Sequence, residues 1–332
     1  MVTENSIEIG GYMPLELGYL GERENEPFCN IDEKNKIRFN AARYAICYAV
    51  QEGKFKKIYI PLYMCISIGE TLARYGIKYE TYSIDDEFFP IMRKNEDDTC
   101  ILICNYYGIQ GEYFYQRCLN RYRNIIFDNT QALYQYPIMD DGIYNVYSPR
   151  KFVGCIDGAY LIKKDIEKKQ LPVSQSWGKG SFLLKSLEGG TNYAYTDYLQ
   201  SEGTITKEGM CSMSSFTQKY LSSIEYDRLQ EKRKLNYQFL YKKLNDYNKL
   251  HIQNGRDLCP MVYPLLPKNR IDRKILIQMK IYIPQWWKWV INQEKATRWE
   301  IELSQSLLPL PIDHRYNEKE MQILTKIIQD LF

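Results

Sequence analysis

The sequence has few of the residues that mark several common kinds of protein. It contains only two histidines, His251 and His314, and its 9 cysteines are scattered without a Cys-x-x-Cys pair. This leaves little material for a zinc site, a histidine-based catalytic triad or a disulfide framework. There is no window of about 18 apolar residues that could span a bilayer, and the first residues do not resemble a signal peptide. We therefore expect a cytoplasmic protein with reduced cysteines and no membrane partner.

Basic and acidic residues nearly balance. Lysine and arginine total 44 and aspartate and glutamate 41, which gives a formal net charge of +3. Without a basic stripe, no nucleic-acid partner is expected. Nucleotide motifs are missing too, because no Gly-x-Gly-x-x-Gly follows a strand and no Walker-type Gly-Lys-Ser/Thr occurs. Small anions could still bind in a local pocket.

The first 200 or so residues alternate short apolar strands with helical segments. The expected helices cover 41–54, 66–75 and 112–122, and the expected strands cover 57–61, 77–84, 100–104, 124–128, 143–147 and 159–162. This alternation predicts an α/β sheet with helices on both faces. In such sheets the functional groups gather at the carboxyl ends of the strands.

The pattern changes near residue 200. We expect one long helical segment over 214–244, strands over 261–266 and 281–283, and helices over 272–279 and 317–332. A chain of 332 residues is long enough for two cores. We predict a large α/β domain over 1–205, which includes an amino-terminal segment 1–36, and a smaller α+β domain over 206–332.

A stretch around Lys151 carries the candidate chemistry. Lys151 lies between two expected strands, beside Arg150 and before Gly154 and Gly158. Apolar residues follow the lysine, and partial desolvation would lower the pKa of its amine and make it a nucleophile. The alternative is an ordinary basic surface turn.

A carboxylate ends an earlier expected strand. Asp128 is followed by Gln131, and Lys151 comes further along. A strand-end acid followed by a strand-end lysine suits pyridoxal 5′-phosphate. The aldehyde of this cofactor forms a Schiff base with a lysine, and its ring withdraws electrons when a carboxylate keeps the pyridine nitrogen protonated.

Two motifs link these residues to a known family. Residues 128–132 read Asp-Asn-Thr-Gln-Ala, and residues 148–151 read Ser-Pro-Arg-Lys, with Asp-Gly at 157–158. They resemble the Asp-x-x-Gln-Ala motif and a divergent Ser…Lys…Gly-Gly stretch of the DegT/StrS-type sugar aminotransferases, and weaker similarities extend along nearly the whole chain. The resemblance implies the pyridoxal-phosphate-dependent transferase fold type I. That fold has a mostly parallel, seven-stranded-type sheet in a large domain and a smaller α+β carboxyl-terminal domain.

The resemblance also implies a role for each matching residue near the ring of the cofactor. Lys151 would form the Schiff base and then carry the proton that is transferred, and Asp128 would pair with the pyridinium nitrogen. Gln131 would reach the phenolic oxygen or the phosphate. Either Tyr63 or Tyr106 would stack on the pyridine ring.

Other implied roles concern the phosphate. Ser148 would donate a hydrogen bond to it. The start of the helix at Ala42, with Arg43 as an extra charge, would receive it through backbone N–H groups and the helix dipole. Asn192 would reach the phosphate of the neighbouring subunit, so the implied protein is a homodimer with shared active sites.

The implied reaction transfers an amino group from an amino-acid donor to a keto-sugar acceptor on a nucleotide, in surface polysaccharide biosynthesis. Three departures from the family pattern leave alternatives open: Ala41-Ala42 replaces the usual Ser-Gly, Cys65 occupies the usual aromatic stacking position, and Ala194 replaces an arginine. A non-catalytic or regulatory protein that keeps the fold is the second hypothesis. Different pyridoxal chemistry on an amino-acid-like substrate is the third.

Overall fold

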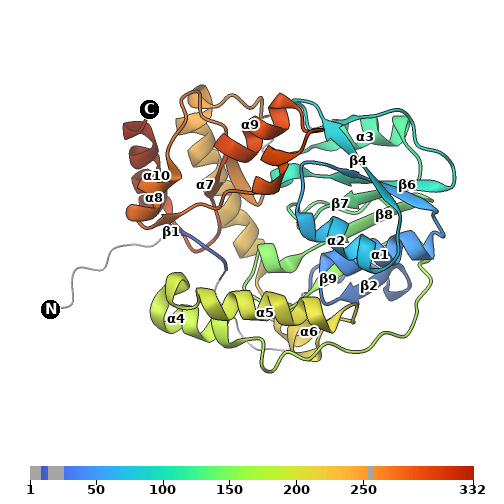
Figure 1. Ribbon diagram of the computed structural model, residues 1–332. Coiled ribbons are helices and arrows are strands. Elements are labelled where there is room, and N and C mark those ends of the chain that lie inside the picture. Colours follow the sequence, from blue (N-terminus) through green and yellow to red (C-terminus); the bar gives the residue numbers. More distant parts are fainter. Residues whose placement is uncertain (1–8, 14–25, 253–257) are drawn as a thin grey trace.

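The structure is a computed structural model that describes residues 9–13, 26–252 and 258–332. Much of the amino-terminal stretch that we expected to be loop-rich, residues 1–8 and 14–25, lies outside the described residues. An eight-stranded sheet forms one half of the molecule. Helices α7 (Tyr226–Leu244), α8 (Arg273–Gln278) and α10 (Glu318–Asp330) gather beside it in the other half (Figure 1).

The strand order in this sheet is β2-β9-β8-β7-β6-β3-β4-β5. Strands β3, β4, β6, β7 and β8 run parallel to one another, whereas β9, β2 and β5 are joined to their neighbours by antiparallel pairing. The predicted mostly parallel α/β fold is therefore confirmed. The strands are β2 (Lys36–Phe39), β3 (Lys57–Pro61), β4 (Tyr79–Ile84), β5 (Pro90–Ile91), β6 (Thr99–Cys104), β7 (Ile125–Asp128), β8 (Ile143–Tyr147) and β9 (Ala159–Ile162).

The central strands are buried along their length. Every residue of β6, β8 and β9 is buried, as expected for apolar strands that are covered on both faces. The register sets Cys104 opposite Asp128 and Asp128 opposite Val146. The carboxyl ends of β6, β7 and β8 thus meet at one edge of the sheet.

The helices of the sheet half are α1 (Ala42–Glu52), α2 (Ile66–Arg74) and α3 (Glu112–Arg121). Helices α4 (Ser181–Tyr193), α5 (Tyr195–Glu208) and α6 (Ser215–Ser222) lie along the bottom of the molecule in the view of Figure 1. The hydroxyl of Tyr44 on α1 donates to the carbonyls of Ile205 and Thr206, at 3.2 Å each. Helix α5 is therefore held against the start of α1.

The prediction of one long helix over 214–244 is wrong. The chain forms α6 and then α7 (Tyr226–Leu244), with a break between them. The hydroxyls of Ser222 and Ser223 donate to the carbonyls of Lys219 and Tyr220, at 2.7 Å each. Serine side chains that bond to nearby backbone compete with helix propagation, which the apolar spacing alone does not reveal.

The carboxyl-terminal half contains two small sheets, in which β10 pairs antiparallel with β12 and β11 pairs parallel with β1 (Ile9–Gly10). The amino-terminal strand thus joins the carboxyl-terminal elements, and the backbone N–H of Gly10 donates to the hydroxyl of Tyr316 at 2.7 Å. No helix in the described part of the chain is both long and apolar enough to cross a membrane. The remaining elements of this half are β10 (Val262–Leu265), α8 (Arg273–Gln278), β11 (Ile281–Tyr282), α9 (Arg298–Ser306), β12 (Leu308–Pro311) and α10 (Glu318–Asp330).

Candidate active site

A cavity of about 940 Å³ lies between the two halves of the chain. Its sheet side includes Cys104, Asp128 and Lys151, and its other side includes Met261 and Pro309. A cleft of this size can enclose a small-molecule ligand or a cofactor. The carboxyl ends of β6 and β7 open directly into it, as expected for an α/β sheet.

Asp128 and Lys151 are linked by a short chain of hydrogen bonds. The Lys151 Nζ donates to the Thr130 Oγ1 at 2.7 Å, and the Thr130 N–H donates to an Asp128 oxygen at 3.0 Å. The other Asp128 oxygen accepts from the Cys104 thiol at 3.6 Å. Burial raises the pKa of Cys104 well above its ordinary value, so the thiol remains a donor. Both carboxylate oxygens of Asp128 are therefore oriented.

The backbone around Lys151 is also fixed. Lys151 ends a short 3-10 helix, η3 (Pro149–Lys151), and the Phe152 N–H donates back to the Pro149 carbonyl at 2.8 Å. The Phe152 carbonyl accepts from the buried guanidinium of Arg233 on α7 at 3.2 Å. The carboxyl-terminal half thus contributes to the position of the lysine, and the sequence alone did not indicate that contact.

Asp157 of the Asp-Gly pair at 157–158 has a structural role. Its carboxylate is fully buried and accepts from the Ser214 N–H at 2.9 Å and the Ser214 hydroxyl at 2.8 Å, and it also accepts from the Thr217 hydroxyl. These bonds tie the lysine loop to the start of α6. Gly158 has a φ of +131°, a backbone conformation that favours glycine.

Gln131 lines the cavity and holds a tight turn. Its Oε1 accepts from the Tyr107 N–H at 2.6 Å, in the 3-10 helix η2 (Tyr106–Gly108). Gly108 has a φ of +78°, and a Cβ on it would lie 2.3 Å from the Gln131 carbonyl oxygen. Since the side-chain oxygen of Gln131 is engaged, its amide nitrogen is the group left to donate to a ligand.

The predicted phosphate end lies on the same cavity. Ala42, Arg43 and Ser148 all line it, next to the amino terminus of α1. Ala41 at the cap position has no side-chain hydrogen bond, so the first N–H groups of α1 receive no capping bond from it. The Arg43 guanidinium donates to the Thr206 hydroxyl at 3.0 Å. The assignment of these residues to a phosphate stays a prediction.

The structure does not bring Tyr63 and Tyr106 to the cavity wall. Both rings are buried, and neither lines the cavity. The Tyr106 hydroxyl donates to the Tyr63 carbonyl at 2.7 Å, and the Tyr63 hydroxyl bonds to that of Tyr107 at 2.8 Å. Met64 and Cys65 line the cavity next to Tyr63. The strand has ended here, so alternation could not predict which side chain would face the cavity.

Asn192 does line the cavity, but it does so within its own chain. It lies in the last turn of α4, where Gly190 with a φ of +81° interrupts the helical backbone. The prediction that Asn192 reaches the phosphate of a neighbouring subunit remains a prediction, because the structure contains one chain.

Aromatic side chains line two other parts of the cavity. Trp286 and Trp287 come from the segment after β11, and Tyr198 comes from α5. The Tyr198 ring stacks on Tyr12, with ring centroids 4.7 Å apart. Large aromatic faces suit contact with flat or ring-shaped ligands. The sequence had not pointed to Tyr198 on α5 as a residue of this cavity.

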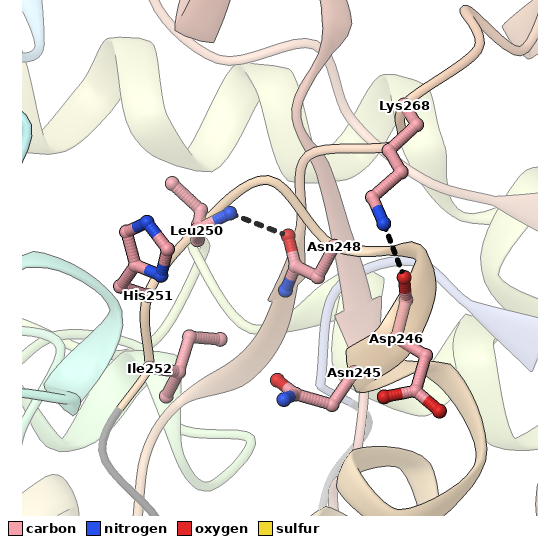
Figure 2. A pocket seen from close by; sticks show the side chains of 7 residues that line it. All are labelled: Asn245, Asp246, Asn248, Leu250, His251, Ile252 and Lys268. Carbon is pink, nitrogen blue, oxygen red and sulfur yellow. Dashed lines mark hydrogen bonds between the residues drawn. The ribbon is translucent and has the colours of Figure 1, made fainter.

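A second hollow of about 400 Å³ shares no lining residue with this cavity (Figure 2). The Asn248 Oδ1 accepts from the Leu250 N–H at 3.1 Å, and the Lys268 Nζ donates to the Asp246 carbonyl at 2.7 Å. These bonds go to backbone groups and support the loop itself. The lining residues are Asn245, Asp246, Asn248, Leu250, His251, Ile252 and Lys268.

Comparisons with known proteins define the class of fold. No known family model matches the sequence, and no curated protein matches it. Solved structures do match along almost the whole chain, and they are aminotransferases with the fold that the sequence motifs implied.

Three of these structures are a sugar aminotransferase, a putative sugar aminotransferase and an aminotransferase involved in the biosynthesis of pseudoaminic acid. CalS13 from Micromonospora echinospora, a sugar aminotransferase, is 13% identical, with a TM-score of 0.64 over 90% of this chain and 87% of its own. PseC from Helicobacter pylori, an aminotransferase in pseudoaminic acid biosynthesis, is 11% identical, with a TM-score of 0.63 over 98% and 99%. Spr1654 from Streptococcus pneumoniae, in its PLP form, is 11% identical, with a TM-score of 0.59 over 97% and 93%. At this identity the similarity establishes the fold.

Proposed function

We propose that the protein is a cytoplasmic, pyridoxal-phosphate-dependent aminotransferase. It would move an amino group from an amino acid to a keto sugar carried on a nucleotide, in surface polysaccharide biosynthesis. The observation that carries the proposal is the Lys151–Thr130–Asp128 chain of hydrogen bonds at adjacent strand ends. The fold of known sugar aminotransferases supports it.

The residues present fit this cofactor. Pyridoxal phosphate, when bound, supplies an aldehyde that reacts with an amine and a ring that withdraws electrons. Lys151 provides the amine and Asp128 a carboxylate that can hold a ring nitrogen protonated. At the phosphate end, the buried Nε atoms of Arg43 and Arg150 have no hydrogen-bond partner among the described residues, so donors are available for an anion.

The chain's own groups would act as follows. The Lys151 amine would accept and return a proton, which removes the need for a catalytic histidine. The Thr130 hydroxyl holds that amine at 2.7 Å and sets its direction. The Cys104 thiol and the Thr130 N–H keep the Asp128 carboxylate in place. The aromatic wall at Trp286 and Trp287 would exclude water and contact the sugar or its carrier.

Absorbance spectroscopy and chromatography test the proposal. The purified protein is mixed with pyridoxal phosphate, and the cofactor released from it is identified before and after addition of glutamate and other amino-acid donors. Conversion of the aldehyde form to the amine form is the expected result. A folded protein that never takes up the cofactor would contradict the proposal. Cofactor uptake without conversion by any donor would favour the non-catalytic alternative that Ala41-Ala42 and Cys65 suggest.

We further propose a homodimer with shared active sites. Helices α4 and α5 expose Leu184, Leu187, Tyr195 and Leu199, each with about half of its surface accessible in the single chain. Tyr195 and Asn192 also line the cavity. A second copy that packs on this face would therefore lie next to the active-site cavity of its partner. Mixing inactive Lys151→Ala and Asn192→Ala subunits tests this. Recovered activity is expected if each site uses residues from both chains, and none is expected if it does not.

A further inference from the structure

One end of the cavity contains two arginines and one glutamate. Arg150, directly before Lys151, pairs with Glu202 on α5, and Arg43 lies in the first turn of α1. All three side chains line the cavity, together with Ala41 and Ser148. The sequence motifs assigned no role to Arg150 or Glu202.

Both partners of the ion pair are charged. Burial raises the pKa of Glu202, but Arg150 and Arg43 together lower it, and the net pKa lies below its ordinary value. Burial disfavours the charge on Arg150, but Glu202 overcomes this effect and raises the pKa of the guanidinium. Arg43 adds a second positive charge near the same carboxylate. The three groups therefore carry a net charge of one positive unit.

The donors at this end exceed the acceptors. The buried Nε atoms of Arg43 and Arg150 have no hydrogen-bond partner among the described residues. Unpaired buried donors cost free energy, so they are uncommon in folded proteins unless a ligand completes them. The amino terminus of α1 adds backbone N–H groups and a partial positive charge. Positive charge and spare donors together suit a doubly charged anion such as a phosphate monoester.

We propose that Arg150 is an anion-binding residue for the phosphate of the cofactor, and that Glu202 competes with this phosphate for the guanidinium. The inference rests on the proposed function for the identity of the cofactor. It explains how the cavity can hold a phosphate although Ala41-Ala42 lack the hydroxyl of the usual Ser-Gly. Because Glu202 lies on α5, the contact with the anion would also depend on the position of that helix.

Binding to the cofactor-free, full-length protein tests the proposal. Dissociation constants are measured for pyridoxal 5′-phosphate and for pyridoxal, which has the same aldehyde and ring but no phosphate. In Arg150→Gln we expect the constant for pyridoxal phosphate to rise at least about tenfold, since a hydrogen bond to a charged group is lost. In Glu202→Gln we expect it to fall by about threefold or more, because a neighbouring negative charge is removed. The constant for pyridoxal should change little in either variant.

Asp197→Asn is the matched control. Asp197 also lies on α5 and pairs with Lys185 of α4 at 2.8 Å, but neither residue lines the cavity. This variant removes an ion pair from the same helix and should leave the preference for pyridoxal phosphate over pyridoxal unchanged. Circular dichroism melting checks that each variant folds. If Arg150→Gln does not fold, Glu202→Gln still tests the proposal.

Three results would overturn the inference. The first is an equal loss of both ligands in Arg150→Gln. The second is weaker binding of pyridoxal phosphate in Glu202→Gln, which would make the ion pair a structural element. The third is a change in the dissociation constant of UDP, but not of pyridoxal phosphate, in these variants, which would assign the anion site to a nucleotide carrier.

A separate probe keeps the inference apart from the proposed function. Inorganic phosphate should raise the melting temperature of the wild-type protein and raise it less in Arg150→Gln. If the protein never binds pyridoxal phosphate but this difference appears, the proposed function fails and the anion-binding role of Arg150 stands. If the difference is absent, that role fails.

Discussion

The two ends of the cavity are built in different ways. At the Asp128 end, neighbouring strand ends hold one another through hydrogen bonds, and the polar groups follow directly from the sheet register. At the Arg150 end, a helix that lies far along the chain supplies the balancing carboxylate. Local motifs therefore describe the first end well, whereas the second depends on which helix covers it.

The largest expected effect is at the end with the lysine. Lys151→Ala should abolish covalent attachment of the cofactor and all aminotransferase activity, because no other described lysine lines the cavity. Borohydride treatment followed by peptide mass spectrometry measures the attachment. Lys164→Ala, an exposed lysine after β9, is the control and should behave like the wild type. Attachment that persists in Lys151→Ala would show that another residue binds the cofactor covalently.

Asp128→Ala should lower turnover by at least about a hundredfold, since the ring nitrogen loses the carboxylate that keeps it protonated. Lys151 is unchanged, so the cofactor should still attach. Steady-state kinetics measured together with the cofactor content separate the two effects. Asp140→Ala, in the exposed turn before β8, is the matched control. Equal turnover in the two variants would show that Asp128 makes no contribution to the reaction.

Gly108→Ala tests whether the turn held by Gln131 is rigid. The added Cβ would lie 2.3 Å from the Gln131 carbonyl oxygen and would force a left-handed backbone on alanine. We expect a loss of roughly 2 kcal/mol or more in the free energy of unfolding. Gly111→Ala has open space around it and a negative φ, so it should change this free energy much less. Denaturant unfolding of the two variants and the wild type measures these changes in the free energy of unfolding.

Tyr63→Phe has the smallest expected effect. It removes one hydroxyl of the buried pair with Tyr107 and should lower the free energy of unfolding by about 1 kcal/mol. The cofactor absorbance should not change, because Tyr63 does not line the cavity. A clear spectral change would place Tyr63 at the ring, as the sequence had suggested.

The sequence predicted the parts of the fold that have a regular period. The strands at 100–104, 124–128 and 143–147 are short, largely apolar runs followed by polar residues, and they appear with at most one residue of difference at an end. The break between α6 and α7 and the pairing of β1 with β11 were not predicted. The first depends on local serine bonds and the second on a two-residue contact between distant segments, and neither leaves a periodic signal.

The sequence alone indicated that Asp128 ends one strand and that Lys151 follows shortly after another. Groups that follow strands of a parallel sheet are expected to gather at the edge where the carboxyl ends of the strands meet. Tertiary structure decided which groups share the cavity with Asp128 and Lys151. Arg150 and Glu202 are 52 residues apart, and only the packing of α5 against α1 brings the pair to the cavity. Tertiary structure also kept Tyr63 and Tyr106 off the wall, because the direction of a side chain just after a strand depends on the turn that follows.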